Sequence, residues 1–111
     1  SKSDASLKVQ VLNEIEHVIS GGVGPVNALN NAIKKALIKF YSSIKNVKLV
    51  DYKVRVIDGQ NGTESKVRVL SESTDGSKNW VTVGVSRNII DATLKSLKDS
   101  YNFYLIKNIK E

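Results

Sequence analysis

Apolar and polar residues alternate over residues 7–12, a period of two that is typical of a half-buried strand. A second strand is predicted over residues 15–20, after a tight turn around Asn13. The segment Gly21–Pro25 interrupts this pattern, and its proline favours the start of a helix. Apolar residues then recur at spacings of three and four, which predicts an amphipathic helix of about four turns. Its apolar face comprises Val26, Leu29, Ile33, Leu37 and Phe40.

The same order of patterns returns in the second half of the chain. Alternation over residues 50–56 predicts a strand, residues 58–62 a hairpin loop, and residues 67–69 the returning strand. The pair Asp75-Gly76 predicts the next turn, and residues 80–85 predict a third strand.

A second helix is predicted to follow this third strand. Ser86 or Asn88 is the expected N-cap, and Asp91 suits the positive end of the helix dipole. The last ten residues either extend this helix or pack as a tail. Its predicted apolar face comprises Ile90, Leu94, Leu97 and Tyr101.

The two halves resemble each other in detail. Ser6–Leu12 is similar to Glu64–Leu70, and Val26–Ala28 at one helix start corresponds to Ile90–Ala92 at the other. The second half shows three strands and a helix, whereas the first shows two strands before its helix.

These patterns predict an α+β fold of two βββα-type units related by internal pseudo-symmetry. Residues 7–41 form the first unit and residues 47–105 the second, within a single domain spanning residues 1–111. The first strand of the first unit is expected upstream of Ser1, so we expect this chain to be a fragment of a longer protein.

Length and composition narrow the classes of function. A chain of 111 residues forms one domain, and 41% hydrophobic residues exclude wholesale disorder. No apolar run approaches the roughly 20 residues of a membrane span, and no signal peptide opens the chain. The absence of cysteine excludes thiolate chemistry, and a single histidine leaves little for zinc. These features suit a cytoplasmic protein with no membrane partner.

The net charge of +6 raises the question of phosphate-rich partners. The lysines are scattered, however, and five like charges nowhere run together. Trp80 and Tyr52 on strands could stack on bases, although strand aromatics more often belong to the core. A solvated basic surface is therefore the favoured interpretation, and no nucleic-acid partner is predicted.

The glycine-rich turn is the strongest candidate for a ligand site. Gly21, Gly22 and Gly24 either only turn the strand into a helix or let a ligand approach the backbone. Free N–H groups at a helix start favour an anion such as a carboxylate, and the repeat supplies a second helix start at Ser86–Asn88. No Lys-Ser or Lys-Thr pair follows, which excludes a P-loop. His17 has no cysteine or serine nucleophile patterned with it, so no catalytic residues and no metal ligands are assigned.

Three motifs together carry a family resemblance. Gly22–Ala28 is similar to the Gly-x-Gly-Pro-Val-Asp/Asn-Ala signature of the C-terminal, LeuA-type allosteric and dimerisation domain of α-isopropylmalate and citramalate synthases. Leu49–Val56 resembles that domain's central strand, and Trp80–Ala92 completes the match. The resemblance runs from Leu7 to about Leu105, and the forms of the second and third motifs look more like the citramalate branch.

The resemblance implies a regulatory role. In this family the domain follows a TIM-barrel catalytic region, which condenses acetyl-CoA with a 2-keto acid and uses a divalent metal. The domain itself carries no cofactor, forms a homodimer, and binds the end-product amino acid that inhibits the enzyme. In the citramalate branch the acceptor is pyruvate and the effector isoleucine; in the isopropylmalate branch they are 2-ketoisovalerate and leucine.

The resemblance also implies an effector pocket. It is formed by the first glycine-rich turn, the central strand and the second helix start: Gly22, Val23, Gly24, Pro25, Val26, Asn27, Ala28, Leu49, Tyr52, Val56, Val85 and Asn88. Backbone groups of the glycine turn would hold the charged ends of the amino acid, and strand residues would line an apolar side-chain pocket. Asn27 replaces the Asp common in the family, which removes a potential ion pair to the ligand's ammonium group. Val23 likewise replaces the polar residue often found between the glycines.

Alternation along the central strand conflicts with one part of this pocket. It puts Leu49 on the face opposite to Tyr52 and Val56, so a pocket lined by all three would draw on both sheet faces or on a second copy. Isoleucine is the favoured effector, and a leucine-sensing domain of 2-isopropylmalate synthase is the alternative. A basic nucleic-acid-binding module is a more distant alternative, and a free-standing enzyme comes last.

Overall fold

The computed structural model describes residues 2–11, 14–57 and 65–108, and over residues 2–23 it describes the backbone alone. The chain divides into two compact units, Ser1–Val47 and Lys48–Glu111, each of which is described by itself. Both combine antiparallel strands with one helix, so the predicted α+β class is confirmed. The predicted turn at Asn13 and hairpin loop at residues 58–62 lie outside the described residues.

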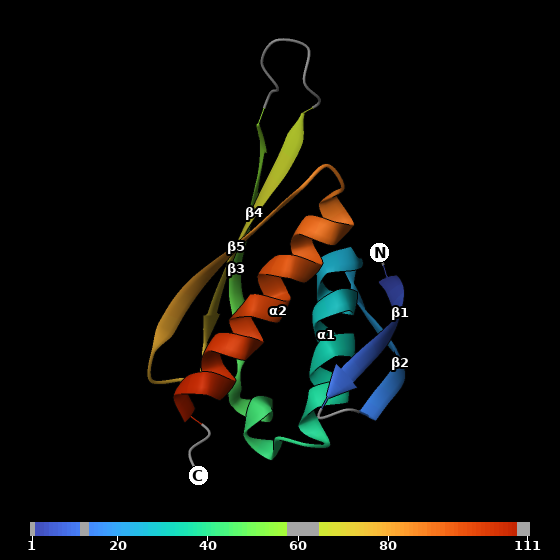
Figure 1. The fold of residues 1–111 in the computed structure, drawn as a ribbon, viewed down its shortest axis with the longest axis vertical. Helices are drawn as coiled ribbons and strands as arrows, with labels where there is room; N and C mark the ends of the chain where they lie inside the picture. The colour runs from blue at the N-terminus through green and yellow to red at the C-terminus, as the bar shows by residue number, and fades with distance from the viewer. Residues whose placement is uncertain (1, 12–13, 58–64, 109–111) are drawn as a thin grey trace. The chain divides into compact units, whose positions relative to one another are not determined.

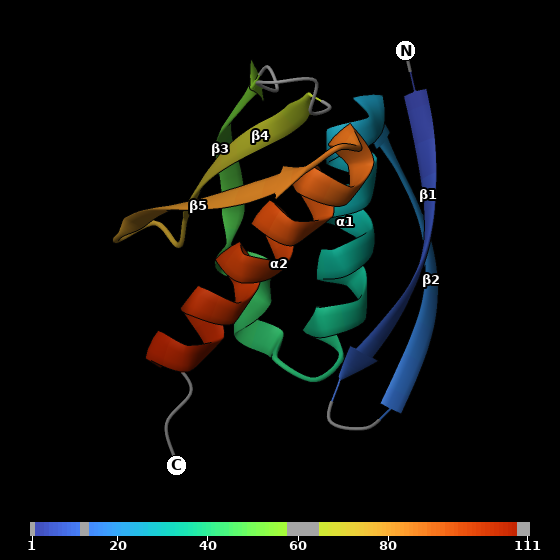
Figure 2. The same cartoon turned by 45° about the horizontal axis from the view of Figure 1, so that its top comes forward.

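The first unit is a hairpin covered by a helix. Strands β1 (Lys2–Val11) and β2 (Glu14–Val23) pair antiparallel, and α1 (Gly24–Ile38) packs against both of them (Figures 1 and 2). A short 3-10 helix, η1 (Ser42–Asn46), follows. The sequence predicted that the strand breaks at Gly21, and this prediction is wrong. Gly21 and Gly22 still pair with Asp4 and Ser3 on β1. Cross-strand pairing here overrides the low strand propensity of glycine.

Helix α1 buries the predicted stripe together with small residues. Leu29, Ile33 and Leu37 are buried, as predicted from their spacing, whereas Val26 and Phe40 are half-buried. Gly24 has a φ of 81°, a conformation that favours glycine, and Pro25 occupies the first turn, where its missing N–H costs nothing. The buried small residues recur once per turn: Ala28, Ala32 and Ala36.

The second unit is a three-stranded sheet with a helix across one face. Strands β3 (Lys48–Ile57), β4 (Lys66–Thr74) and β5 (Asn79–Ser86) pair antiparallel in chain order. Helix α2 (Ile89–Asn108) lies along one side of this sheet (Figures 1 and 2). The helix therefore extends well beyond Tyr101, which decides between the two predicted fates of the C-terminal segment.

A β-bulge early in β3 changes which side chains share a face. Leu49 pairs with Ser73 and Tyr52 pairs with Ser71, while the register shifts between Leu49 and Asp51. Ser71 and Ser73 lie two positions apart, so they point to the same side of the sheet. Leu49 and Tyr52 therefore share that face, and the conflict that strict alternation predicted does not exist.

Hydroxyl groups, rather than large apolar side chains, fill much of the contact between α2 and the sheet. Ser96 Oγ lies 2.6 Å from Ser71 Oγ, and Ser100 Oγ lies 2.6 Å from Ser73 Oγ. Trp80 Nε1 donates to the Ser100 carbonyl oxygen at 3.1 Å. We call these five residues the polar seam.

The buried face of α2 differs from the predicted one. Leu97 and Tyr101 are buried as expected, but Leu94 is half-buried and Ile90 is 43% exposed. Small residues take the buried positions because α2 approaches β5 closely at Gly84, where a side chain would meet the helix backbone. The remaining buried positions of α2 are Ala92, Thr93, Ser96, Ser100 and Tyr104.

The β4–β5 turn forms as the Asp75-Gly76 pair predicted. Asp75 Oδ1 accepts hydrogen bonds from the N–H groups of Ser77 and Lys78, both at 2.8 Å, and Gly76 has a φ of 94°. These two backbone donors, Lys78 first, lower the pKa of Asp75 below its ordinary value. The ionised carboxylate of Asp75 therefore stabilises the turn.

Candidate functional site

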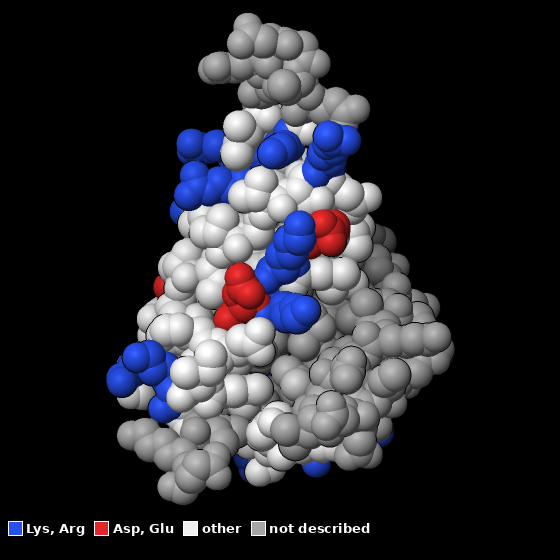
Figure 3. All heavy atoms as spheres, in the orientation of Figure 1, with Lys and Arg blue, Asp and Glu red and all other residues white. Residues whose placement is uncertain are grey.

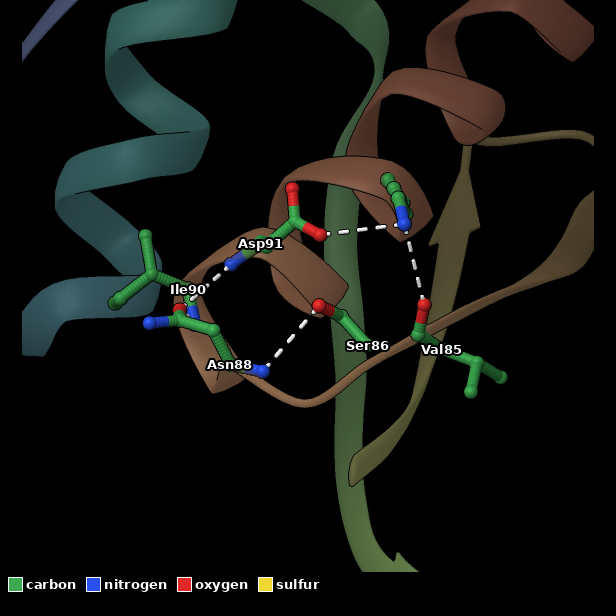
Figure 4. A network of polar contacts seen from close by, with 6 residues as sticks. Val85, Ser86, Asn88, Ile90 and Asp91 are labelled. Atoms are coloured by element: carbon green, nitrogen blue, oxygen red, sulfur yellow. Dashed lines mark hydrogen bonds and ion pairs between the residues drawn. The ribbon is translucent and has the colours of Figure 1, made fainter. Parts of the chain in front are cut away.

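The start of α2 is held by a network of polar contacts with the end of β5 (Figure 4). Asn88 Oδ1 accepts hydrogen bonds from the N–H groups of Ile90 at 2.7 Å and Asp91 at 3.0 Å. The Asn88 N–H donates to Ser86 Oγ at 3.2 Å. Asn88 is therefore the N-cap, and Ser86 supports it from the preceding strand.

Asp91 ties the first helical turn to the next one. Its carboxylate lies 3.2 Å from Lys95 Nζ, which also donates to the Val85 carbonyl oxygen at 3.3 Å (Figure 4). A hydrogen bond from the Ser86 side chain, followed by that from Lys95, lowers the pKa of Asp91. The ionised carboxylate also sits at the positive end of the helix dipole, as the sequence predicted.

The two helix starts differ in what they leave for an anion. At the start of α2, Asn88 already occupies two of the backbone donors that a carboxylate would use. The anion site that the repeat predicts at residues 86–88 would therefore have to displace the Asn88 cap to use these two donors. At the start of α1, Gly24 and Pro25 carry no side-chain acceptor, and no acidic residue lies in the first turn.

Beside Tyr52, the second unit exposes an apolar surface on the helix side of its sheet. Val54 pairs with Val69, and Val56 pairs with Val67, which continues the face that Tyr52 shares with α2. Val54 is 43% exposed and Val56 is 62% exposed. We call Val54 and Val56 the apolar surface.

Ile90, which is 43% exposed, lies near the start of α2. The Tyr52 hydroxyl lies 2.7 Å from Thr93 Oγ1, which fixes Thr93 toward β3. Ile90 precedes Thr93 by three residues and so lies on the same side of the helix, one turn nearer its start. The start of α2 and the end of β3 that carries Val56 lie toward the same end of the second unit (Figure 1).

The predicted pocket residues of the second unit do not all share one face. Leu49, Tyr52 and Val56 lie on the helix side of the sheet. Val85 lies on the other side, because its neighbour Gly84 faces α2 and strand residues alternate, and its side chain points away from the network in Figure 4. Asn88 is engaged as the helix cap. Within this unit, Val85 therefore cannot line the same pocket as Tyr52.

The predicted pocket residues of the first unit surround the start of α1. Gly22 and Val23 end β2, and Gly24 begins the helix. Ala28 is fully buried, so its side chain packs in the core and does not wall an open site. The other members of this group are Pro25, Val26 and Asn27, of which Val26 is half-buried.

The sequence analysis missed Val54, Ile90 and Thr93. Val54 was recognisable as a member of the alternating strand, next to two residues that were assigned to the pocket. Thr93 gave no signal, because its role depends on the hydroxyl that Tyr52 brings from β3. Ile90 was placed in the core by helical periodicity, which gave no sign that small residues would fill the contact with the sheet.

The side chains that the structure describes, those of residues 24–57 and 65–108, bear on metal binding and on base stacking. Among residues 24–57 and 65–108, no three Asp or Glu side chains gather where they could hold a metal ion. Trp80 is 8% exposed and stacks on Tyr104 at 5.8 Å between ring centroids, so its ring belongs to the core, as favoured from the sequence. Of the helices described, none is long and apolar enough to cross a membrane.

Comparison with known proteins gives one consistent family. The chain matches the family described as LeuA allosteric (dimerisation) domain over residues 1–105. It is 53% identical over 106 residues to the (R)-citramalate synthase of Geobacter sulfurreducens, covering 96% of this chain and 20% of that protein. It is 48% identical over 109 residues to the (R)-citramalate synthase of Aquifex aeolicus, covering 98% of this chain and 21% of that protein.

A more distant relative carries the other activity named by the resemblance. The 2-isopropylmalate synthase of Methanocaldococcus jannaschii is 29% identical over 106 residues, covering 96% of this chain and 19% of that protein. The chain thus spans about a fifth of the length of these relatives. The family match and the two high identities carry the same conclusion as the sequence motifs: the chain belongs to the LeuA allosteric (dimerisation) domain family and is similar to the citramalate synthases within it.

Proposed function

We propose that this domain binds a branched aliphatic amino acid, isoleucine in preference to leucine, and thereby inhibits a catalytic region that joins acetyl-CoA to pyruvate. The observation that carries the proposal is the apolar surface beside Tyr52, at the central strand to which the resemblance assigns the effector's side chain. Burying exposed valine side chains against an aliphatic ligand removes apolar surface from water, which favours binding. A divalent metal would belong to the catalytic region and not to this domain.

The preference for isoleucine rests on relatedness. The identities of 53% and 48% are to citramalate synthases, against 29% to the 2-isopropylmalate synthase. Packing alone distinguishes two isomeric side chains by only about 1–3 kcal/mol, so we expect leucine to bind with lower affinity rather than not at all.

Calorimetric titration with isoleucine and leucine tests the proposal. Val56→Asp places a charge in the apolar surface and should weaken isoleucine binding at least tenfold. Val81→Asp is the matched control, because Val81 is 54% exposed but lies on the face of the sheet away from α2. Equal effects of the two variants, or no saturable binding of either amino acid, would contradict the proposal.

The glycine turn is tested separately. Gly24→Ala introduces a side chain at a φ of +81° and should weaken binding of the amino acid's charged ends. Gly76→Ala introduces the same kind of strain at a φ of +94° in the β4–β5 turn, again with open space around it. A loss of affinity in the first variant alone would support a ligand at the start of α1; a matched loss in both would reflect stability only.

A further inference from the structure

The face of the β3–β4–β5 sheet that points away from α2 carries an unusual arrangement of charge. On β3 and β4 the cross-strand partners on this outer face are Asp51 with Glu72, Lys53 with Leu70, and Arg55 with Arg68. Opposite charges across neighbouring strands stabilise a sheet, and like charges directly opposite destabilise it. The outer face instead pairs acid with acid and arginine with arginine.

The acidic residues of this face have partners of their own. Asp51 Oδ2 lies 3.7 Å from Lys53 Nζ, and Glu72 Oε2 accepts a hydrogen bond from Asn79 Nδ2 at 2.9 Å. Glu72 lies four residues from Arg68 along β4, about 13 Å at ~3.3 Å per residue. Among residues 24–57 and 65–108, whose side chains the structure describes, no carboxylate forms an ion pair with Arg55 or Arg68. The arginine pair is therefore a local cost with no compensation among those residues, which is typical of a functional site.

A hollow lies over this pair. Its volume is about 530 Å³, and it opens to solvent between Lys53, Val54, Arg55, Arg68 and Leu70. This volume is in the range of small-molecule sites. Figure 3 shows several Lys and Arg side chains near the upper end of the second unit, and further Lys and Arg side chains lower down beside the Asp and Glu side chains.

We propose that the hollow binds an organic ligand that carries two or more phosphate groups. Arg55 and Arg68 would hold phosphate oxygens through their planar guanidinium groups, and Lys53 would add a third positive charge. Leu70 provides an apolar wall for the organic part of the ligand. The described residues place no aromatic side chain on the outer face, which favours a small polyphosphate ligand over a single-stranded nucleic acid.

The site is separate from the one under Proposed function. Its charged side chains, Lys53, Arg55 and Arg68, lie on the opposite face of the sheet from Tyr52 and Val56, although Val54 of the apolar surface also lines the hollow. Loss of the arginine pair is therefore expected to leave isoleucine binding unchanged.

Calorimetric titration with ADP, inorganic pyrophosphate and adenosine tests this proposal. We expect saturable binding of ADP and pyrophosphate, with adenosine at least tenfold weaker. Arg68→Gln and Arg55→Gln should each weaken ADP binding tenfold or more, whereas Lys98→Gln, which removes the same charge from the exposed side of α2, should leave it unchanged. Without ligand, each arginine variant should have a Tm equal to or above that of the parent, because the like-charge pair is gone.

Three outcomes would overturn the proposal. They are the absence of saturable binding of ADP and pyrophosphate, an equal loss of affinity in Lys98→Gln, and binding of an acidic peptide in place of ADP. The second outcome would mean that only the overall positive charge attracts the anion, and the third that the face is a protein-binding surface.

Discussion

Gly84 is the residue on which the packing of the second unit depends most directly. A Cβ at this position would overlap the Ala92 carbonyl oxygen and would lie 2.8 Å from the Ser96 backbone nitrogen. Both obstacles are helix backbone, so no side-chain rotation relieves them. The close approach of α2 to β5 is possible only because this residue has no side chain.

Gly84→Ala should therefore lower the free energy of unfolding by at least about 3 kcal/mol, since overpacking a rigid contact forces the helix away from the sheet. Urea denaturation measures this. Gly76→Ala provides the comparison: open space surrounds Gly76, and its cost should be limited to about 1–2 kcal/mol of backbone strain. Similar losses in both variants would mean that α2 adjusts its position easily.

Asp91 links the helix start to pH. Its pKa is lowered by the Ser86 side chain and by Lys95, so the ionised form favours the folded state. This contribution is fully present above the pKa of Asp91 in the unfolded chain and is lost as pH falls through the lowered folded value. Ser86→Ala should raise the pKa of Asp91 toward the ordinary aspartate value, as measured by NMR titration of the carboxylate. An unchanged pKa would assign the effect to Lys95 alone.

At the scale of elements, the polar seam joins α2 to the sheet through paired hydroxyls. Ser96→Ala should cost about 1–3 kcal/mol, because it leaves the buried Ser71 hydroxyl without its partner 2.6 Å away. Removing both hydroxyls in Ser71→Ala with Ser96→Ala should cost less than the sum of the two single changes. A double-mutant cycle in urea measures this coupling, and strictly additive losses would show that the two hydroxyls do not stabilise each other.

Element types were predictable from the sequence, but the faces they present were less so. The spacing of Leu29, Ile33 and Leu37 identified the buried side of α1, because there the large apolar residues form the core. The same reasoning misplaced Ile90 on α2, because hydroxyl pairs and a glycine replace large side chains in that contact. Periodicity reports which residues are apolar, and it does not report how closely two elements approach.

The match between strand segments of the two halves is out of register with the observed pairing. On β1 and β2, Ala5 pairs with Ser20, and on β4 and β5, Val69 pairs with Gly84. Ser20 and Gly84 hold equivalent places before the two helix starts, which makes Ala5 the counterpart of Val69. The sequence match instead aligned Val11 with Val69. The internal repeat stays a prediction, and helix starts are its better guide.

The whole molecule carries a net charge of +6, which bears on how two copies meet. Like-charged copies repel each other, and salt screens that repulsion over about 8–10 Å at moderate ionic strength. We therefore expect self-association of this dimerisation-family domain to strengthen as salt rises from about 50 mM, as followed by sedimentation velocity. Weaker association at high salt would mean that ion pairs between copies outweigh the repulsion.

The candidate site was predictable only as far as the family motifs reach. They led to the start of α1 and to β3, where Tyr52 and Val56 border the apolar surface. They also included Val85, whose side of the sheet is fixed by Gly84 and not by any motif. Chain proximity between the third strand and the second helix start was thus mistaken for a shared face.

The bulge at Val50 has a consequence for reading related sequences. Upstream and downstream of it, odd and even positions of β3 exchange roles, so Leu49 and Tyr52 both face the helix. A relative that lacked one residue here would keep its core only if the inside–outside pattern on one flank were reversed. Sequences in this family can therefore be aligned by their alternation of apolar and polar residues as well as by identity. An alignment gap within this strand should coincide with a switch in that alternation. A gap without such a switch marks an alignment error.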